Sequence, residues 1–405
     1  MVRNTTETSG GIPQGELKSA QGDTAPISRA ERVERARKNW IERLIDHSRR
    51  NNLLYFRELK HGNLLLPNAT REQISTILRG QPRSVLELLA LQVDGRDETE
   101  RRKNREALEQ TVFAKLRAIR AKAVENLEER GLDTLNLAVG FATWPSDDGE
   151  RPPEAPVLLV PITIDQRGTS RDRFIIQRTG EAHVNPVLIH VLESILRVRI
   201  SSDDILSSSE DDEDIDVQAI FDRLSKIASG IAGFRIEAKC AVGNFSFAKM
   251  AMVQDLRENG EILLNHDIIA AVAGDPDARA SLRSSLPDPD PREFDSTPPA
   301  DEFLVLDADS SQHQVIAQLL HGRSGVIQGP PGTGKSQTIT NAIAALVARQ
   351  KRVLFVAEKR AALEVVQRRL SEVGLDGLVL DLHGADISRK QVMARVAEAL
   401  ANIKK

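Results

Sequence analysis

The segment Gly329–Ser336, GPPGTGKS, limits the possible folds of this chain more than any other stretch of the sequence. It follows a short apolar run, SGVIQ, and precedes the amphipathic pattern of a helix that extends to about Arg349. Its glycines permit backbone conformations that side chains exclude, so that successive amide N–H groups can turn inward onto phosphate oxygens. The N-terminus of the following helix offers further N–H groups to the same anion. The segment therefore predicts a phosphate-binding turn between a strand and a helix.

The residue types that follow the glycines have separate expected roles. Lys335 is expected to reach the β- and γ-phosphates and so to act in catalysis, and the Ser336 hydroxyl is expected to bind the metal ion. Strand, G-x-x-x-x-G-K-S and helix in this order form the P-loop in the context that it requires. The motif thus predicts ATP and Mg²⁺ as ligands. A plain Gly-Pro turn is the competing interpretation, which the agreement of motif, strand and helix disfavours.

Apolar runs alternate with helical patterns beyond this motif. Residues 352–357 (RVLFVA) and 377–382 (GLVLDL) are typical of buried strands, and residues 359–373 and 387–403 of helices. The alternation predicts parallel strands joined by right-handed crossovers, hence a doubly wound α/β sheet with nucleotide at the carboxyl ends of its strands. We assign residues 301–405 to this P-loop domain.

The preceding residues have a different pattern. Residues 1–27 are polar without apolar periodicity, which predicts a disordered tail. Residues 28–283 begin with helical patterns and then contain short β-rich runs, LNLAVGFATW, APVLLVPITID and RFIIQR, separated by turn-rich stretches. They predict an α+β domain with a small antiparallel sheet. Residues 284–300 hold 5 prolines in 17 positions, which excludes helix and predicts an extended linker.

The cysteine, histidine and aromatic contents exclude several kinds of site. The single cysteine, Cys240, rules out an intramolecular disulfide framework and a Cys-cluster zinc site, and its apolar surroundings favour a core residue over a nucleophile. The 8 histidines show no metal-ligand spacing. Aromatic residues form 3% of the chain, which argues against base stacking as the main way to bind nucleic acid. No signal peptide or long apolar run is present, so a cytoplasmic protein outside the membrane is expected.

Residues 311–370 resemble superfamily 1 helicases, in particular the class that contains the nonsense-mediated-decay helicases. The resemblance rests on Ser311-Gln312 ahead of the P-loop, on the Walker A sequence IQGPPGTGKSQT, and on VLFVAEKRAALEVVQRRL at the position of motif Ia. It implies a RecA-like fold in which Gln312 reads the adenine, although a polar residue on a helix surface remains the alternative for Gln312. The nucleotide-binding residues that it implies are Gln312, Gly329, Gly332, Thr333, Gly334, Lys335, Ser336 and Gln337.

Charge and motif Ia together predict a nucleic-acid partner for this region. Residues 322–405 contain 14 basic and 7 acidic residues, a balance that suits a polyanion. By the resemblance, Lys359 and Arg360 are expected to contact the backbone of single-stranded DNA or RNA.

Three earlier segments resemble the N-terminal domain of unknown function found in large bacterial helicase-nuclease proteins. These segments are WIERLIDHSRRNNLLYF, APVLLVPITI with its downstream VNPVL, and GNFSFAKMAMVQDL. Such proteins continue into a second RecA-like domain. Because the DE-type motif II and the arginine motifs are absent from the sequence, the resemblance implies a truncated P-loop domain, inactive alone and completed by a separately encoded C-terminal helicase or nuclease half.

These features predict the ATP-binding N-terminal part of a superfamily 1 DNA or RNA helicase-like protein, which couples ATP hydrolysis to translocation or unwinding once it is complete. Hydrolysis needs a carboxylate that holds magnesium, for which Asp381 is the formal candidate and a capping or surface role the alternative. Two other functions stay open. One is an AAA-type or other P-loop ATPase that does not act on nucleic acid, and the other is a non-catalytic nucleotide-binding or interaction module.

Overall fold

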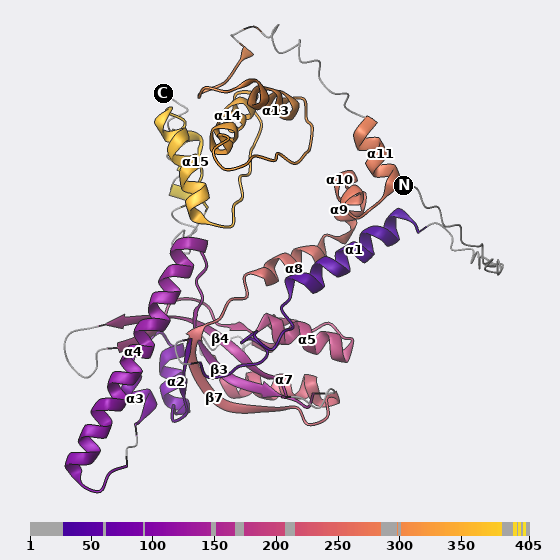
Figure 1. Ribbon diagram of the computed structural model, residues 1–405. Helices are drawn as coiled ribbons and strands as arrows, with labels where there is room; N and C mark the ends of the chain where they lie inside the picture. Colours follow the sequence, from indigo (N-terminus) through magenta and orange to yellow (C-terminus); the bar gives the residue numbers. More distant parts are fainter. Residues whose placement is uncertain are drawn as a thin grey trace, which may run out of the picture. The chain divides into compact units, whose positions relative to one another are not determined.

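The computed structural model describes residues 27–59, 62–91, 94–146, 151–166, 174–206, 215–284, 298, 301–382 and parts of 392–401 (Figure 1). The chain divides into two compact units, residues 1–40 with 259–285 and residues 41–258 with 286–405. Nearly all of the predicted tail and of the predicted proline-rich linker lies outside the described residues. Every helix within the described ranges is too short or too polar to cross a membrane. The domain boundaries given above stay a prediction.

The smaller unit is helical. Its elements are the first part of α1 (Arg29–Leu44), with α9 (Gly260–Asn265), α10 (Asp267–Val272) and α11 (Pro276–Ser284). The start of α1 carries the capping box S-x-x-E, in which the Glu31 amide donates to Ser28 Oγ at 3.2 Å and the Ser28 amide donates to Glu31 Oε2 at 2.9 Å. Val33 is buried together with Ala270 and Ala278, and these side chains form the small core of this unit.

An antiparallel sheet organises residues 41–258, as the β-rich runs predict. Seven strands are paired in the order β1-β7-β3-β4-β5-β2, with β6 on β4. Central strand β3 is buried along its whole length. Because both faces of β3 are covered, its sequence is mostly apolar and does not alternate between apolar and polar residues. The strands are β1 (Asn63–Leu66), β2 (Arg83–Ser84), β3 (Leu135–Thr143), β4 (Glu154–Gln166), β5 (Phe174–Arg178), β6 (His183–Val184) and β7 (Arg235–Asn244).

Helices pack on this sheet at several places (Figure 1). The long helix α4 contacts β1, β3 and β7 and ends at Arg130, after which Gly131 takes the left-handed conformation with φ 67°. The acidic run at residues 201–216 predicts a solvated connector, but residues 202–206 form a short helix in which Ile205 is fully buried. Residues 207–214 lie outside the described residues. The helices are α2 (Arg71–Leu78), α3 (Val85–Leu89), α4 (Glu98–Arg130), α5 (Pro186–Leu196), α6 (Ser202–Leu206), α7 (Val217–Ile227) and α8 (Lys249–Glu258).

One buried amide connects three segments of the sheet body. Asn185 is fully buried, and its Nδ2 donates to the carbonyl oxygens of Leu53 at 2.7 Å and Pro156 at 2.8 Å. Its Oδ1 accepts from the amide of Val187 at 3.0 Å and so caps α5. A single side chain thereby satisfies polar groups that the core would otherwise leave without partners.

Residues 301–382 contain the helices that the P-loop pattern predicts. They are α13 (Ser310–Leu320), α14 (Lys335–Ala348) and α15 (Arg360–Glu372), with a 3₁₀ turn, η3, at Asp376–Leu378. The helices expected at residues 335–349 and 359–373 are thus confirmed, whereas the helix expected at residues 387–403 lies mostly outside the described residues.

The parallel sheet expected in this region is not formed among the described residues. Residues 324–328, 352–357 and 377–382 make no strand ladder with one another. Val326 and Leu354 are 89% and 83% exposed, so these apolar runs face solvent. A parallel strand is stable when neighbours pair its backbone and both its faces are covered. Apolar composition predicted the strands, but the described residues supply neither the pairing nor the cover, and the observed fold is mixed α/β with an antiparallel sheet in its front part.

We expect replacement of Asn185 by alanine to lower the free energy of unfolding by about 2 to 4 kcal/mol, because carbonyl oxygens and amides would be left buried without partners. Urea unfolding followed by circular dichroism measures this change. Asn104→Ala is the control, since Asn104 is exposed and donates only to the Asp94 carbonyl at 3.0 Å; its expected effect is below about 0.5 kcal/mol. Equal effects of the two substitutions would contradict the role of Asn185.

Candidate nucleotide-binding site

The predicted phosphate-binding turn leads directly into α14. Gly334 is the N-cap of this helix and takes the left-handed conformation with φ 70°. As a glycine it offers no side chain to the free amides of the first helical turn. These amide N–H groups lack intrahelical acceptors and lie at the positive end of the helix dipole. The start of α14 is therefore a set of donors suited to a phosphate group.

Lys335 folds back over its own loop. Its Nζ donates to the carbonyl oxygen of Gly329 and, at 3.0 Å, to that of Pro330. No acidic side chain within the described ranges forms an ion pair with this exposed ammonium group. Neutral carbonyl oxygens therefore hold the ammonium at the turn, and a phosphate oxygen would offer it a stronger, charge-assisted hydrogen bond.

Gln312 connects α13 to the same turn. Its Nε2 donates to the Thr333 carbonyl at 3.2 Å, and its Oε1 accepts from the Asp309 amide at 3.2 Å. The Gln312 amide in turn donates to Asp309 Oδ1 at 2.9 Å, which completes a capping box at the start of α13. Both ends of the side-chain amide are thus engaged within the chain, so rotation of the Gln312 amide toward an adenine would break these bonds.

The neighbouring residues brace the turn and restrict what can replace them. A Cβ atom added to Gly334 would lie 2.5 Å from Gln312 Nε2 and would displace this side chain, and the left-handed backbone favours glycine there. Thr333 Oγ1 donates to the Pro330 carbonyl at 2.9 Å, and Gln337 Nε2 donates to the Asp307 carbonyl at 2.6 Å. Of the predicted nucleotide-binding residues, Thr333 and Gln337 therefore support the shape of the turn by bonds within the chain.

Asn341 is a further supporting residue, which the sequence did not indicate. It is fully buried in α14, and its Oδ1 accepts from the amides of Val305 at 3.0 Å and Leu306 at 2.9 Å. Its Nδ2 donates to the Leu306 carbonyl at 2.9 Å. Asn341 thus holds a segment 35 residues earlier against the helix that carries the phosphate-binding amides. No local sequence pattern predicts a partner at this distance. Asp309 and Gln312, in contrast, form a D-x-x-Q capping motif that can be recognised in the sequence.

Ser336 is the described residue that fits a magnesium ligand at the turn. It is half-buried on the first turn of α14, and its carbonyl, not its hydroxyl, accepts from Thr340 Oγ1 at 2.8 Å. The described residues contain no group of three or more His, Cys, Asp or Glu side chains that could hold a metal ion. A magnesium ion would therefore be held by the Ser336 hydroxyl together with phosphate oxygens and water, which are ligands that this ion accepts.

The other predicted chemical groups lie at α15. Asp381, the formal candidate for the magnesium carboxylate, forms an ion pair with Arg360, whose Nη2 lies 3.8 Å from Asp381 Oδ2. Arg360 Nε also donates to Glu364 Oε1 at 2.8 Å. Lys359 is the exposed N-cap residue of α15. The structure thus pairs Asp381 and Arg360 with each other, while the nucleic-acid contacts of Lys359 and Arg360 stay a prediction.

Cys240 lies in β7 of the sheet body. Its side chain is 2% exposed, and burial raises the pKa of the thiol to about 12. This environment is typical of a small core residue, because only the thiolate is nucleophilic.

Two parts of the chain match known families. The family described as "Protein of unknown function (DUF4011)" matches residues 43–192, and the family described as "AAA domain" matches residues 307–403. The chain is 49% identical over 70 residues to "Uncharacterized ATP-dependent helicase MG140" of Mycoplasma genitalium, and 46% identical over 68 residues to its homolog of Mycoplasma pneumoniae. Each of these matches covers 17% of this chain and 6% of the relative. No solved structure matches the chain.

We expect Asn341→Ala to speed hydrogen exchange at the amides of Val305 and Leu306 by about tenfold or more, because both amides lose their acceptor. Exchange followed by mass spectrometry on peptides that cover these residues measures the effect. Gln337→Ala, which removes one bond to Asp307, is the matched control and should leave these two amides unchanged. Unchanged exchange in Asn341→Ala would show that the hydrogen bonds of Asn341 do not order the segment at Val305 and Leu306.

We expect Cys240 to react with iodoacetamide far more slowly in the folded chain than in the urea-unfolded chain. The rise of its thiol pKa from 9.0 to about 12 leaves about 1,000-fold less thiolate at mildly alkaline pH. Mass spectrometry of the alkylated protein over time gives both rates. Similar rates in the two states would contradict the burial of this thiol.

Proposed function

Because the chain is a superfamily 1 helicase-like protein that includes a domain of unknown function in its N-terminal part, we propose that its turn at residues 329–336 binds Mg-ATP and serves a helicase-like ATPase. The observation that carries this proposal is the uncapped start of α14 with Lys335 held beside it by neutral carbonyl groups. The two similar Mycoplasma proteins are named as uncharacterized ATP-dependent helicases, which supports the same assignment.

Binding of the triphosphate would exchange bonds within the turn for bonds to the ligand. The first amides of α14 would donate to phosphate oxygens, and Lys335 Nζ would leave the carbonyls of Gly329 and Pro330 for the β- and γ-phosphates. This exchange is favourable for Lys335 because its ammonium group would donate to negatively charged phosphate oxygens and no longer to neutral carbonyl oxygens. Magnesium, held by the Ser336 hydroxyl and the nucleotide, would neutralise charge on the phosphate oxygens.

Gln312 would connect the nucleotide base to the turn. Its amide holds the Thr333 carbonyl, so turning it toward an adenine edge would release one support of the turn. Base recognition and loop shape would then depend on one another. This coupling is part of the proposal for ATP, and it rests on the position of Gln312 between α13 and the turn.

Nucleic acid is the proposed polyanionic partner of the helicase-like protein. The excess of basic over acidic residues after residue 322, and the exposed Lys359 at the start of α15, support this partner. Arg360 is less available than Lys359, because it is bonded to Glu364 and paired with Asp381. Translocation or unwinding of DNA or RNA would be an activity of the helicase-like protein as a whole.

A second candidate function is nucleotide binding without turnover. The observation that favours it is the ion pair between Asp381 and Arg360, since the formal magnesium carboxylate and the nearest candidate arginine are engaged with each other. Steady-state ATP hydrolysis by the purified chain, measured with and without single-stranded DNA and RNA, separates the two functions. Hydrolysis that Lys335→Ala abolishes would exclude the non-catalytic function, and stimulation by nucleic acid would exclude an ATPase that does not act on it.

We expect Lys335→Ala to weaken Mg-ATP binding by about 100-fold, because the ammonium group would otherwise make charge-assisted bonds to the phosphates. Isothermal titration calorimetry measures the affinity, and circular dichroism checks that the helices are retained. Lys351→Ala is the control, since Lys351 is exposed and follows the end of α14. This variant should bind ATP as the unchanged chain does. Equal affinities of the two variants would refute the assignment of the site.

A further inference from the structure

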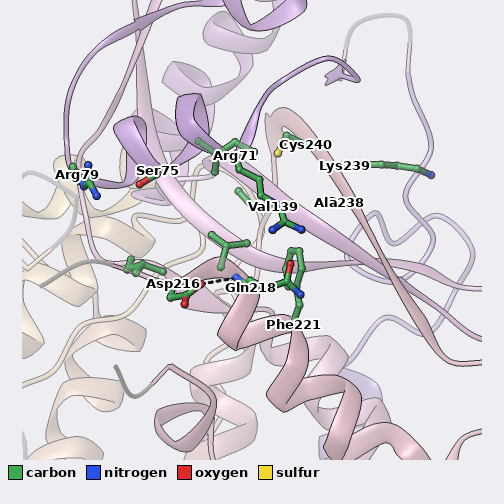
Figure 2. Close-up of a pocket in the computed structure, with 13 residues that line it drawn as sticks. Arg71, Ser75, Arg79, Val139, Asp216, Gln218, Phe221, Ala238, Lys239 and Cys240 are labelled. Atoms are coloured by element: carbon green, nitrogen blue, oxygen red, sulfur yellow. Dashed lines mark hydrogen bonds between the residues drawn. The ribbon is translucent and has the colours of Figure 1, made fainter. Parts of the chain in front are cut away.

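A cavity of about 310 Å³ lies in the sheet body between α2, α7 and the central strands (Figure 2). Its inner wall is apolar and includes Ile74 of α2, Val139 of β3, Val217 and Phe221 of α7, and Cys240 of β7. This volume is at the lower end of the range that small-molecule sites occupy, and an apolar wall with a few polar groups at the rim is typical of such sites.

A β-bulge forms part of the cavity wall. Val139 pairs with Cys240 and Phe141 pairs with Glu237, so Ala238 and Lys239 of β7 both lie opposite Gly140 of β3. Gly140 has φ 73°, and a Cβ atom there would lie 2.2 Å from Phe221 Cζ, so the Phe221 ring packs directly on the glycine backbone. The bulge thus interrupts the regular ladder at the cavity, and bulges are common beside functional sites.

Two charged residues at the rim of the cavity, Asp216 and Lys239, are engaged with other groups of the chain. Asp216 is engaged as the N-cap of α7, accepting from the amides of Gln218 at 2.9 Å and Ala219 at 3.2 Å. Lys239 is paired with Glu237 at 2.7 Å and Glu154 at 3.0 Å, and Figure 2 shows its side chain directed away from the cavity.

Arg71 differs from these two rim residues. It forms no ion pair with an acid in the described part of the chain, and it extends from α2 toward the side of the cavity that α7 forms (Figure 2). Arg79 also lines the cavity but is engaged within the chain, so Arg71 is the cavity-lining arginine that forms no ion pair with a described acid.

We propose that this cavity binds a small amphipathic carboxylate, with the aliphatic part against the apolar wall and the carboxylate on Arg71. The planar guanidinium group binds a carboxylate through two parallel hydrogen bonds, which suits a ligand with a single negative charge. A phosphate monoester carries about −1.5 to −2 charges near neutral pH and would leave part of its charge uncompensated beside an apolar wall. Binding is non-covalent, because the thiol of Cys240 is buried and protonated.

The single cysteine makes the cavity directly observable. Because the sequence contains one cysteine, selective ¹³Cβ-cysteine labelling of the full chain gives one NMR resonance, and its atom lies in the cavity wall. Titration with octanoate is expected to shift this resonance in a saturable way. Binding of octanoate to exposed apolar residues elsewhere would leave the resonance in place.

The role of Arg71 is tested by comparing octanoate with the uncharged 1-octanol. Arg71→Gln is expected to weaken octanoate binding by about tenfold and to leave 1-octanol binding unchanged, because only the carboxylate interacts with the guanidinium group. Arg117→Gln, at an exposed position on α4, is the matched control and should bind both ligands as the unchanged chain does. Ala238→Phe, which fills the cavity from β7, is expected to weaken both ligands at least about tenfold.

Three results would overturn the proposal. The first is the absence of a saturable shift at Cys240, and the second is an equal effect of Arg71→Gln on octanoate and 1-octanol. The third is binding of octyl phosphate more than about tenfold tighter than octanoate, which would assign the rim to a phosphate group instead. None of these results depends on ATP binding, so the outcome is independent of the function proposed for the P-loop.

Discussion

The free amide hydrogens at the start of α14 are the constraint on which the phosphate-binding region depends. Gly334 turns the chain into the helix in the left-handed conformation and leaves these donors without a capping side chain. The residues around the turn keep this end open. Lys335 is held by carbonyl groups and not by an acid, and Gln312 supports the Thr333 carbonyl from α13. An acidic cap or an acidic partner of Lys335 would neutralise the positive end that an anion requires.

The sheet body and the P-loop region differ in how their apolar residues are covered. In the sheet body, β3 and most of β4 are buried, and the polar groups of the core have partners such as the Asn185 amide. In residues 301–382 the buried core is small, with Ile316, Ala342 and Ala345 at its centre, while Val326 and Leu354 face solvent. Helices α13 and α14 pack together through this small core, and Asn341 of α14 binds the amides of Val305 and Leu306, which precede α13. The phosphate-binding turn therefore relies on specific hydrogen bonds more than on a deep apolar core.

The P-loop and the cavity of the sheet body share one feature, which is a cationic side chain without an acidic partner among the described residues. At each place a cation forms no ion pair with an acid in the described part of the chain: Lys335 beside the turn and Arg71 at the rim of the cavity. The surroundings select different ligands. Amide donors and a hydroxyl surround Lys335, which suits a highly charged triphosphate. Apolar side chains form the inner wall of the cavity that Arg71 borders, which suits a ligand with one charge and an apolar part.

Local signals in the sequence were sufficient for the helix starts, the phosphate-binding turn and the β-rich runs. The glycine at position 334, the capping boxes at Ser28 and Asp309 and the stop at Gly131 each act within a few residues, so the sequence alone determined them. The sequence also indicated the antiparallel sheet, because continuous apolar runs separated by turns favour strands.

Only the tertiary structure decided which groups meet across long distances. It joined Asn341 to Leu306, paired Arg360 with Asp381, engaged both ends of the Gln312 amide and left residues 324–328 and 352–357 without a strand ladder. The physical reason is that strand pairing, burial and ion pairing depend on partners far away in the chain, and an apolar run or a single charged residue does not specify its partner.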